Sequence, residues 1–310
     1  MTAEHVSAAA ARAAGPVPEL VVDVRREDDP ALESAIARAD VLVASAIPRG
    51  LIAGACRLSL IQLSTSGIDH LMPLDWLPPD TALTTARGIH GSKLSEWAMM
   101  VFLMLHNGMP HFATAQRRHR WERLLRSSIA GKRALIFGTG GIGRAIAAGA
   151  HRLDVEAIGV RRSPGDAPGF KATLHGDRAM QALGMADFVV LALPLTSATR
   201  RMADAAFFAH MHAGAGFANF GRGDLVDQAA LSDALDSGHL GGAIIDVASP
   251  EPLPAESALW DVSRLVITPH VSADDPEGHV GRVLDVLVEN LRRRRDGLPL
   301  LNEVDRVRAY

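Results

Sequence analysis

The stretch ALIFGTGGIG, residues 134–143, is an apolar run that turns on glycines into RAIAA, residues with helix-forming character. A strand that turns on glycines into a helix is the usual form of a dinucleotide-phosphate site. Gly138 permits the tight turn, Gly140 lets the backbone approach a pyrophosphate, and Gly143 allows helix and strand to pack closely. The first amides of the helix, together with the helix dipole, then face the phosphate charges. This stretch therefore predicts a dinucleotide-binding unit.

Composition narrows the class of protein. The chain has 310 residues, 48% of them hydrophobic and 22% charged, with a formal net charge of −3. This length suits two domains, and the near-neutral balance argues against a nucleic-acid or membrane-surface binder. Cys56 is the single cysteine, which excludes an internal disulfide and a cysteine metal cluster, and we predict no metal site. The longest apolar run, residues 97–105, is too short to span a membrane, and no secretory signal is evident, so we expect a cytoplasmic protein.

Strand-like and helix-like segments alternate along the chain, a pattern typical of α/β domains with parallel sheets. Glycines at 88–92 indicate either a hinge between domains or a loop, and residues 1–12 indicate either a short helix or a frayed tail. We expect strands at 20–24, 41–45, 58–63, 81–85, 134–137, 155–160, 188–193, 216–219, 243–247 and 265–267. We expect helices at 31–39, 51–55, 94–105, 142–153, 228–235 and 281–293.

Three polar side chains follow three of the later strands. Arg222 lies on a glycine-flanked loop, Glu251 on a proline-rich loop, and His270 directly after Thr268-Pro269. Ligands of open parallel sheets bind outside the carboxyl ends of the strands, so these groups are expected to converge. Arg222 can hold a carboxylate in a bidentate fork, protonated His270 can donate a proton, and Glu251 can orient the imidazole. Reduction of a 2-keto acid requires an anion clamp and a proton donor of this kind beside a hydride source.

The order and number of short motifs give the chain a specific resemblance. The segments GID (67–69), SEWA (95–98), GK (131–132), LPLT (193–196), NFGRG (219–223), DVASPEP (246–252), TPH (268–270), ENL (289–291) and GLPLLNEVD (297–305) accompany the glycine loop. Together they resemble the D-isomer-specific 2-hydroxyacid dehydrogenases, in particular the glyoxylate/hydroxypyruvate reductase-like members, over nearly the whole chain. The resemblance implies Arg222 as substrate binder, Glu251 as the partner of the histidine, and His270 as acid/base.

The resemblance also implies a fold and an assembly. The fold is α/β with two doubly wound parallel-sheet (Rossmann-like) domains, the dinucleotide-binding domain being inserted into a flavodoxin-like substrate domain. We expect residues 1–92 and 282–310 to form the discontinuous substrate domain, and 93–281 the NAD(P)-binding domain. Ser66 and Gly67 are expected to bind the substrate carboxylate, together with Arg222 and His270. A homodimer through the dinucleotide domain, to which helix 97–105 contributes, is the expected assembly.

The candidate cofactor contacts form one set at the strand ends. They are Gly138, Thr139, Gly140, Gly141, Ile142, Gly143, Arg161, Arg162, Ser163, Pro194, Thr199, Phe220, Gly221 and Asp246. An NAD enzyme usually carries an acidic residue at the end of the second strand, where it accepts from the ribose 2′-hydroxyl. Here that strand ends in Arg161-Arg162-Ser163, which can hold a 2′-phosphate. We therefore predict NADP(H) as the preferred cofactor, with NAD(H) also possible.

The chain departs from the family pattern at three further places. Residues 1–17 do not read as the usual opening strand and helix. Phe220 stands beside Arg222 where smaller residues are usual, and Asp274 or Asp275 either disfavours a second acidic group on the substrate or faces solvent. The leading hypothesis is an NADP(H)-dependent reductase of a small 2-oxo acid. The alternatives are a nucleotide-sensing binding protein and a phosphite-type dehydrogenase on the same fold; Glu251 in place of glutamine argues against a formate enzyme.

Overall fold

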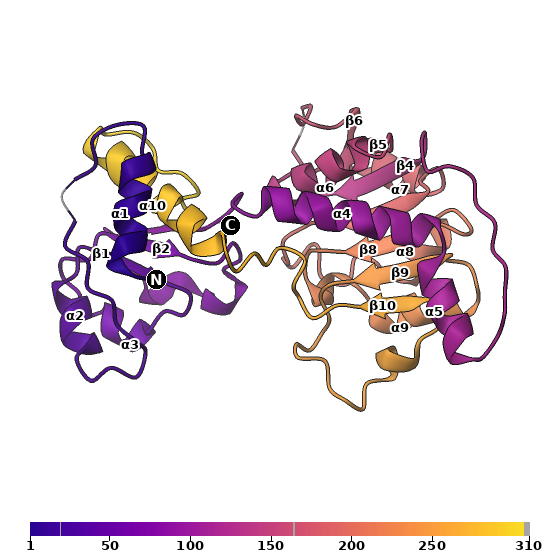
Figure 1. Ribbon diagram of the computed structural model, residues 1–310, viewed down its shortest axis with the longest axis horizontal. Coiled ribbons are helices and arrows are strands. Elements are labelled where there is room, and N and C mark those ends of the chain that lie inside the picture. The colour runs from indigo at the N-terminus through magenta and orange to yellow at the C-terminus, as the bar shows by residue number, and fades with distance from the viewer. Residues whose placement is uncertain (19, 164, 307–310) are drawn as a thin grey trace. The chain divides into compact units, whose positions relative to one another are not determined.

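A computed structural model describes residues 1–18, 20–163 and 165–306. The chain divides into two compact units: unit 1 comprises Met1–Ile89 and Asp275–Tyr310, and unit 2 comprises His90–Asp274 (Figure 1). Both ends of the chain therefore build unit 1, and unit 2 is inserted between them. The expected boundaries at 92/93 and 281/282 fall inside helices α4 (Gly91–His106) and α10 (His279–Arg295), and each of these helices instead lies whole within one unit.

Unit 2 is built on a parallel sheet that has seven strands within the described residues, in the order β10-β9-β8-β7-β4-β5-β6. The strands are β4 (Arg133–Phe137), β5 (Glu156–Val160), β6 (Ala172–Leu174), β7 (Phe188–Leu191), β8 (Gly216–Asn219), β9 (Gly242–Ile245) and β10 (Leu265–Ile267). The chain runs from β4 outward to β6, then crosses back to β7 on the other side of β4. This reversal creates the switch point at which parallel sheets bind ligands.

Both faces of this sheet are buried, as parallel strands require. On one face, Ile136 and Val190 pack against α4 and α6 (Gly141–His151), which lie side by side across the sheet (Figure 1). On the other face, alternate strand residues such as Leu135 pack against α7 (Asp177–Leu183), α8 (Ala205–His210) and α9 (Gln228–Asp236). Helix α5 (Met109–Arg117) continues from α4 and packs near β9.

Unit 1 holds a smaller parallel sheet, with three strands in the described part of the chain, in the order β1-β2-β3. Its elements are α1 (Ala3–Arg12), α2 (Leu32–Arg38), β1 (Val41–Ala44), α3 (Arg49–Ile52), β2 (Leu60–Leu63), β3 (Ala82–Thr84) and α10. The side chains of β2 alternate between two cores: Leu60 faces the α1–α10 pair, whereas Ile61 and Leu63 pack with α2 and α3 residues. Helices therefore cover both faces of this sheet as well.

The strand expected at 20–24 is wrong, although burial alternates from Leu20 to Val22 as it does in a strand. Leu20 and Val22 pack on the α1–α10 core, while Val21 is 97% exposed and Val24 52% exposed. No backbone hydrogen bond pairs this segment with β1 among the residues described, so packing on one side alone holds it. The N-terminus forms α1, capped by Thr2, and not a frayed tail. Pattern reading did not predict α5, β6, α7 or α8, which are short or lie beside long loops.

Within the described residues, no helix combines the length and the apolar character needed to cross a bilayer.

Candidate active site

The glycine loop joins β4 to α6 through backbone contacts that leave no room for side chains. Gly138 has a φ of +109°, and a Cβ placed on it would lie 2.4 Å from the Ala192 carbonyl oxygen. A Cβ on Gly143 would lie 1.8 Å from the Gly138 carbonyl oxygen. Only glycine allows this turn and this closeness of helix and strand, as the sequence predicts.

Gly140 differs from Gly138 and Gly143 because its Cα faces open space. No heavy atom lies within 4 Å of a Cβ built there, directly before α6 begins at Gly141. The first amides of α6, including that of Ile142, have no partner within a helix and are suited to an anion. Thr139 rests on β5, where its methyl group lies 2.7 Å from a Cβ built on Gly159. The loop is thus a cradle that a side chain would fill, and its residues fit the pyrophosphate of a dinucleotide.

Arg161, Arg162 and Ser163 follow β5 directly, beside the glycine loop. The backbone of Arg161 is tied to the adjacent segment: its N–H donates to the Leu174 carbonyl at 3.1 Å, and its carbonyl accepts from His175 Nδ1 at 3.1 Å. Arg161 is half-buried, while Arg162 and Ser163 are exposed. A strand end that presents guanidinium groups and a hydroxyl, with no carboxylate among these three residues, is suited to an additional phosphate.

The loop after β7 carries Pro194 and Thr199, and the threonine hydroxyl organises it. Thr199 Oγ1 donates to the Pro194 carbonyl at 2.8 Å and accepts from the Thr196 N–H at 2.8 Å. Both candidate cofactor residues therefore belong to one closed turn at the switch point of the sheet.

Arg222 is presented by a loop that Asn219 organises from the end of β8. The Asn219 side chain, 1% exposed, donates to the Arg222 carbonyl at 2.8 Å and accepts from the Gly221 N–H at 3.0 Å. Arg222 Nη1 donates to the Gly221 carbonyl at 2.8 Å, and the side chain is half-buried. A Cβ on Gly223 would lie 1.9 Å from the Ala248 carbonyl oxygen, so the Arg222 loop touches the loop that carries Glu251.

His270 and Glu251 form the pair that the sequence predicts. His270 Nδ1 lies 2.9 Å from Glu251 Oε2, and Glu251 Oε1 accepts the Ala248 N–H at 3.0 Å. Both side chains are partly exposed, the histidine side chain to 50%. His270 has a φ of +54°, a left-handed conformation that non-glycine residues adopt rarely and often at functional sites.

Asp246 holds the His270 loop in that conformation. The carboxylate is 2% exposed and accepts three hydrogen bonds from the loop: from Thr268 Oγ1 at 2.6 Å, and from the Val271 and Ser272 amides at 3.0 Å each. The Asp246 carbonyl also accepts the His270 N–H at 2.8 Å. The sequence predicts a cofactor contact for Asp246, whereas its carboxylate contacts in the structure all go to this loop. The positioning role was missed because the partners lie more than 20 residues further along the chain.

The remaining candidates lie in varied surroundings. Phe220 is 6% exposed and packs in the core beneath α4 and α6. Ser66 and Gly67 belong to unit 1, where Ser66 Oγ donates to the Ala86 carbonyl at 3.2 Å. The Asp275 carboxylate accepts hydrogen bonds from Arg282 and from the Gly278 N–H, and these bonds hold its pKa below the usual value. All three residues belong to unit 1.

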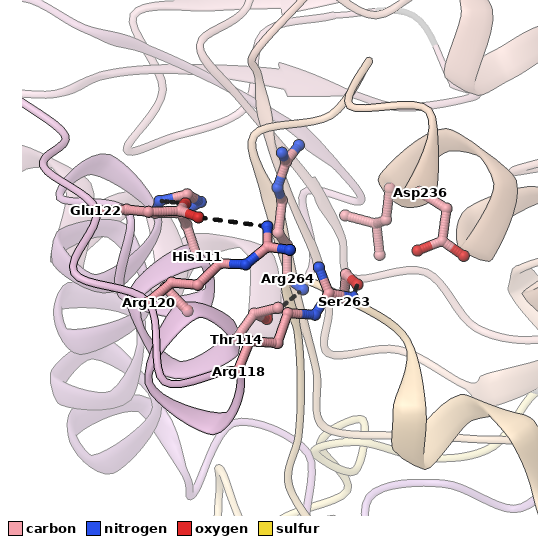
Figure 2. Close-up of a pocket in the computed structure, with 10 residues that line it drawn as sticks. His111, Thr114, Arg118, Arg120, Glu122, Asp236, Ser263 and Arg264 are labelled. Atoms are coloured by element: carbon pink, nitrogen blue, oxygen red, sulfur yellow. Dashed lines mark hydrogen bonds and ion pairs between the residues drawn. The ribbon is translucent and has the colours of Figure 1, made fainter.

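A cavity of about 230 Å³ lies away from this site, at the edge of the sheet where β10 begins (Figure 2). Two contacts join polar groups that line it: His111 Nε2 lies 3.2 Å from Glu122 Oε2, and Arg118 donates to Ser263 Oγ at 2.6 Å. Because Ser263 precedes β10, this cavity opens at the amino end of the strand, opposite to the edge that carries the glycine loop.

A glycine loop at the switch point of a parallel sheet, with an imidazole–carboxylate pair at neighbouring strand ends, defines a dinucleotide-dependent oxidoreductase. The family described as D-isomer specific 2-hydroxyacid dehydrogenase, NAD binding domain, matches residues 99–272. The chain belongs to this family and is an NAD(P)-dependent 2-hydroxyacid dehydrogenase, which confirms the resemblance and the Rossmann-like α/β fold predicted from sequence.

Individual relatives agree with this assignment. A D-isomer specific 2-hydroxyacid dehydrogenase from Xanthobacter autotrophicus Py2, solved with NADPH and MES, superposes with a TM-score of 0.86 at 32% identity, over 99% of this chain and 94% of that one. The NADPH-dependent glyoxylate/hydroxypyruvate reductase of Sinorhizobium meliloti, solved with NADP and sulfate, gives 0.81 at 31% identity, over 100% and 97%. An (S)-sulfolactate dehydrogenase from Chromohalobacter salexigens is 30% identical over 73% of this chain and 74% of its own length.

Proposed function

We propose that the protein reduces a small 2-oxo acid to the 2-hydroxy acid with NADPH. The observation that carries this proposal is the His270–Glu251 pair, 2.9 Å apart, on loops at the carboxyl edge of the sheet that holds the glycine loop. The nicotinamide, when bound, supplies the hydride to the carbonyl carbon. The chain must then supply a proton, an anion clamp and a cradle for the phosphates.

His270 acts as the proton donor in this proposal. Its Nδ1 faces the Glu251 carboxylate, which favours the tautomer with the proton on Nδ1 and leaves Nε2 to face the substrate. In the protonated imidazole, Nε2–H donates to the carbonyl oxygen as the hydride reaches carbon, and the oxygen becomes the hydroxyl. Glu251, itself held by the Ala248 amide, fixes the ring plane during this transfer.

Arg222 binds the substrate. A guanidinium beside the reacting carbonyl attracts the carboxylate of a 2-oxo acid and polarises the carbonyl oxygen. The two hydrogen bonds of the Asn219 side chain, to the Gly221 N–H and the Arg222 carbonyl, fix the backbone that carries this arginine. They therefore limit the motion of the arginine side chain. Ser66 and Gly67 also bind the substrate carboxylate in the proposal, as the resemblance to the family implies.

Preference for NADPH is supported by Arg161-Arg162-Ser163 at the end of β5, whereas the glycine loop fits the pyrophosphate that NADPH and NADH share. Two structurally similar dehydrogenases were solved with NADPH or NADP. We also propose a homodimer that forms through unit 2, where Met100 and Leu103 on the outer side of α4 are each 39% exposed.

The test is a panel of 2-oxo acids, among them glyoxylate and hydroxypyruvate, followed by nicotinamide absorbance with NADPH and with NADH. We expect turnover with at least one acid and a higher kcat/KM with NADPH. His270→Asn is expected to lower kcat about 10²- to 10⁴-fold with little change in NADPH affinity, because only the transition state uses its proton. Tight NADPH binding without turnover of any acid would instead support the nucleotide-sensing alternative, and oxidation of phosphite would support the phosphite-type one.

A further inference from the structure

The loop that carries Glu251 is held at Ser249 by a single side chain of α9. Gln228 Nε2 donates to the Ser249 carbonyl at 2.7 Å, and Gln228 Oε1 accepts the Ser249 N–H at 3.0 Å. The glutamine amide thus pairs with both backbone groups of one residue, as a neighbouring strand would. This pairing fixes the loop two residues before Glu251.

The side chain of Ser249 makes a second attachment. Ser249 Oγ donates to Asp224 Oδ1 at 2.5 Å, while Arg200 Nη1 donates to Asp224 Oδ2 at 2.5 Å. The Ser249 hydroxyl, and then the Arg200 guanidinium, hold the pKa of the Asp224 carboxyl below its usual value. The carboxylate therefore stays ionised at neutral pH, and its hydrogen bond with Ser249 is charge-assisted.

These contacts connect the two loops that carry the reaction. Asp224 and Gln228 follow Arg222 in the chain, whereas Ser249 precedes Glu251. The backbones of the two loops also touch, because the Ala248 carbonyl lies against Gly223. Within the second loop, the Ala248 N–H donates to Glu251 Oε1. A displacement of Ser249 would move Ala248 and with it the hydrogen bond that orients the Glu251 carboxylate.

We propose that Gln228 and Asp224 are positioning residues that hold Ser249 and thereby keep Glu251 in contact with His270. This inference rests on the proposed reductase function, in which that contact orients the proton donor. It assigns the two residues no contact with substrate or cofactor.

Glutamine is specifically suited to this position. The Ser249 pairing needs one donor and one acceptor on the same planar group, and an amide has both. A glutamate of the same shape can accept the Ser249 N–H but would direct a charged oxygen at the Ser249 carbonyl. Gln228→Glu therefore changes one hydrogen bond into a repulsion with almost no change in volume.

The experiment compares Gln228→Glu with Gln116→Glu, which makes the same chemical change at an exposed position of α5. We expect Gln228→Glu to lower kcat about tenfold or more while the NADPH Kd stays within twofold, because one hydrogen bond near a charged group is worth about a factor of ten or more. Gln116→Glu should behave as the wild type. A crystal structure of Gln228→Glu should show a longer distance from His270 Nδ1 to Glu251 Oε2.

Ser249 supplies a second pair of variants that does not depend on the folding of Gln228→Glu. Ser249→Ala removes the bond to Asp224, and Ser249→Thr keeps a hydroxyl. A fall in kcat with alanine that threonine restores, at unchanged NADPH Kd, supports the inference. Wild-type kcat in Ser249→Ala and in a folded Gln228→Glu, or a loss that threonine does not restore, overturns it. If the wild type itself reduces no 2-oxo acid, the proposed function fails instead, and the crystallographic distance still tests the positioning.

Discussion

The glycine loop and the loops that carry Arg222, Glu251 and His270 (the reaction loops) lie at the same edge of one sheet. They are nevertheless stabilised in opposite ways. The glycine loop at 138–143 depends on missing side chains, because backbone atoms occupy the places where Cβ atoms of Gly138 and Gly143 would lie. The reaction loops depend on polar side chains, buried at Asn219 and Asp246 and half-buried at Gln228, which hold backbone groups of these loops. The glycine loop is disrupted when an atom is added, whereas the reaction loops are disrupted when a hydrogen bond is lost.

The largest expected effect comes from adding a methyl group to the glycine loop. Gly143→Ala would place Cβ 1.8 Å from the Gly138 carbonyl oxygen, and because that atom is backbone, strand and helix must separate. We expect a destabilisation of about 3 kcal/mol or more, the upper end of overpacking, with loss of NADPH binding. Urea unfolding and fluorescence titration measure both quantities.

Gly140→Ala is the matched control, since its Cβ meets no heavy atom within 4 Å. It should unfold at the wild-type urea concentration but bind NADPH more weakly, because the methyl group enters the proposed pyrophosphate cradle. Equal stability of the two alanine variants would contradict the packing argument.

The next effect concerns cofactor choice. Arg161→Asp replaces a guanidinium with a carboxylate that repels a 2′-phosphate and accepts from a 2′-hydroxyl. We expect the ratio of kcat/KM with NADPH to that with NADH to fall about 100-fold, since charge-assisted hydrogen bonds contribute about 1.5–3 kcal/mol each. Arg144→Asp, an exposed residue of α6, controls for the general change in charge. An unchanged ratio would show that Arg161 is only a solvated arginine.

A smaller effect is expected for Asp246→Asn, which distinguishes a residue that positions the His270 loop from one that binds the cofactor. In Asp246→Asn, one carboxylate oxygen becomes an NH₂ group, which cannot accept from the loop amides. We expect kcat to fall about tenfold, the equivalent of one lost hydrogen bond to a charged group, at nearly constant NADPH Kd. The opposite result, a weaker NADPH affinity at constant kcat, would support the cofactor contact expected from sequence.

The smallest effect lies outside both regions, in unit 1. The Arg292 and Arg293 guanidiniums beside Glu289 lower the pKa of its carboxyl from 4.5 to about 2. A depressed pKa contributes stability above pH 4.5 that is lost as the pH falls toward 2. Glu289→Gln should therefore unfold at a slightly lower urea concentration at pH 7, and the difference should shrink as the pH falls through this window. A difference that is constant with pH would point to packing rather than charge, and kcat should not change at pH 7.

Most of unit 2 was predictable because its signals are local. Strands such as β4, β8 and β10 are short apolar runs with turn residues after them, and α4 contains a long apolar run. The segment at 20–24 misled the prediction for a physical reason. A short apolar, β-branched segment indicates burial, but it does not show that a neighbouring backbone is available for pairing.

The pairing of His270 with Glu251 was also predictable, because the carboxyl ends of neighbouring parallel strands must meet. The roles of Asp246 and Gln228 were not. A buried carboxylate and a glutamine at the start of a helix have no distinctive pattern in one dimension, and their partners at Val271 and Ser249 lie more than 20 residues away.

The sequence by itself determined the dinucleotide loop, the arginine-rich end of β5, the family, and the three side chains expected to perform the chemistry. These features are local, since each depends on the residue types within a few positions. Only the tertiary structure decided which groups hold two of the elements that carry those side chains: Asp246 for the His270 loop, and Gln228 with Asp224 for the Glu251 loop. Such contacts depend on the register of strands and the approach of loops, and distant parts of the chain set both together.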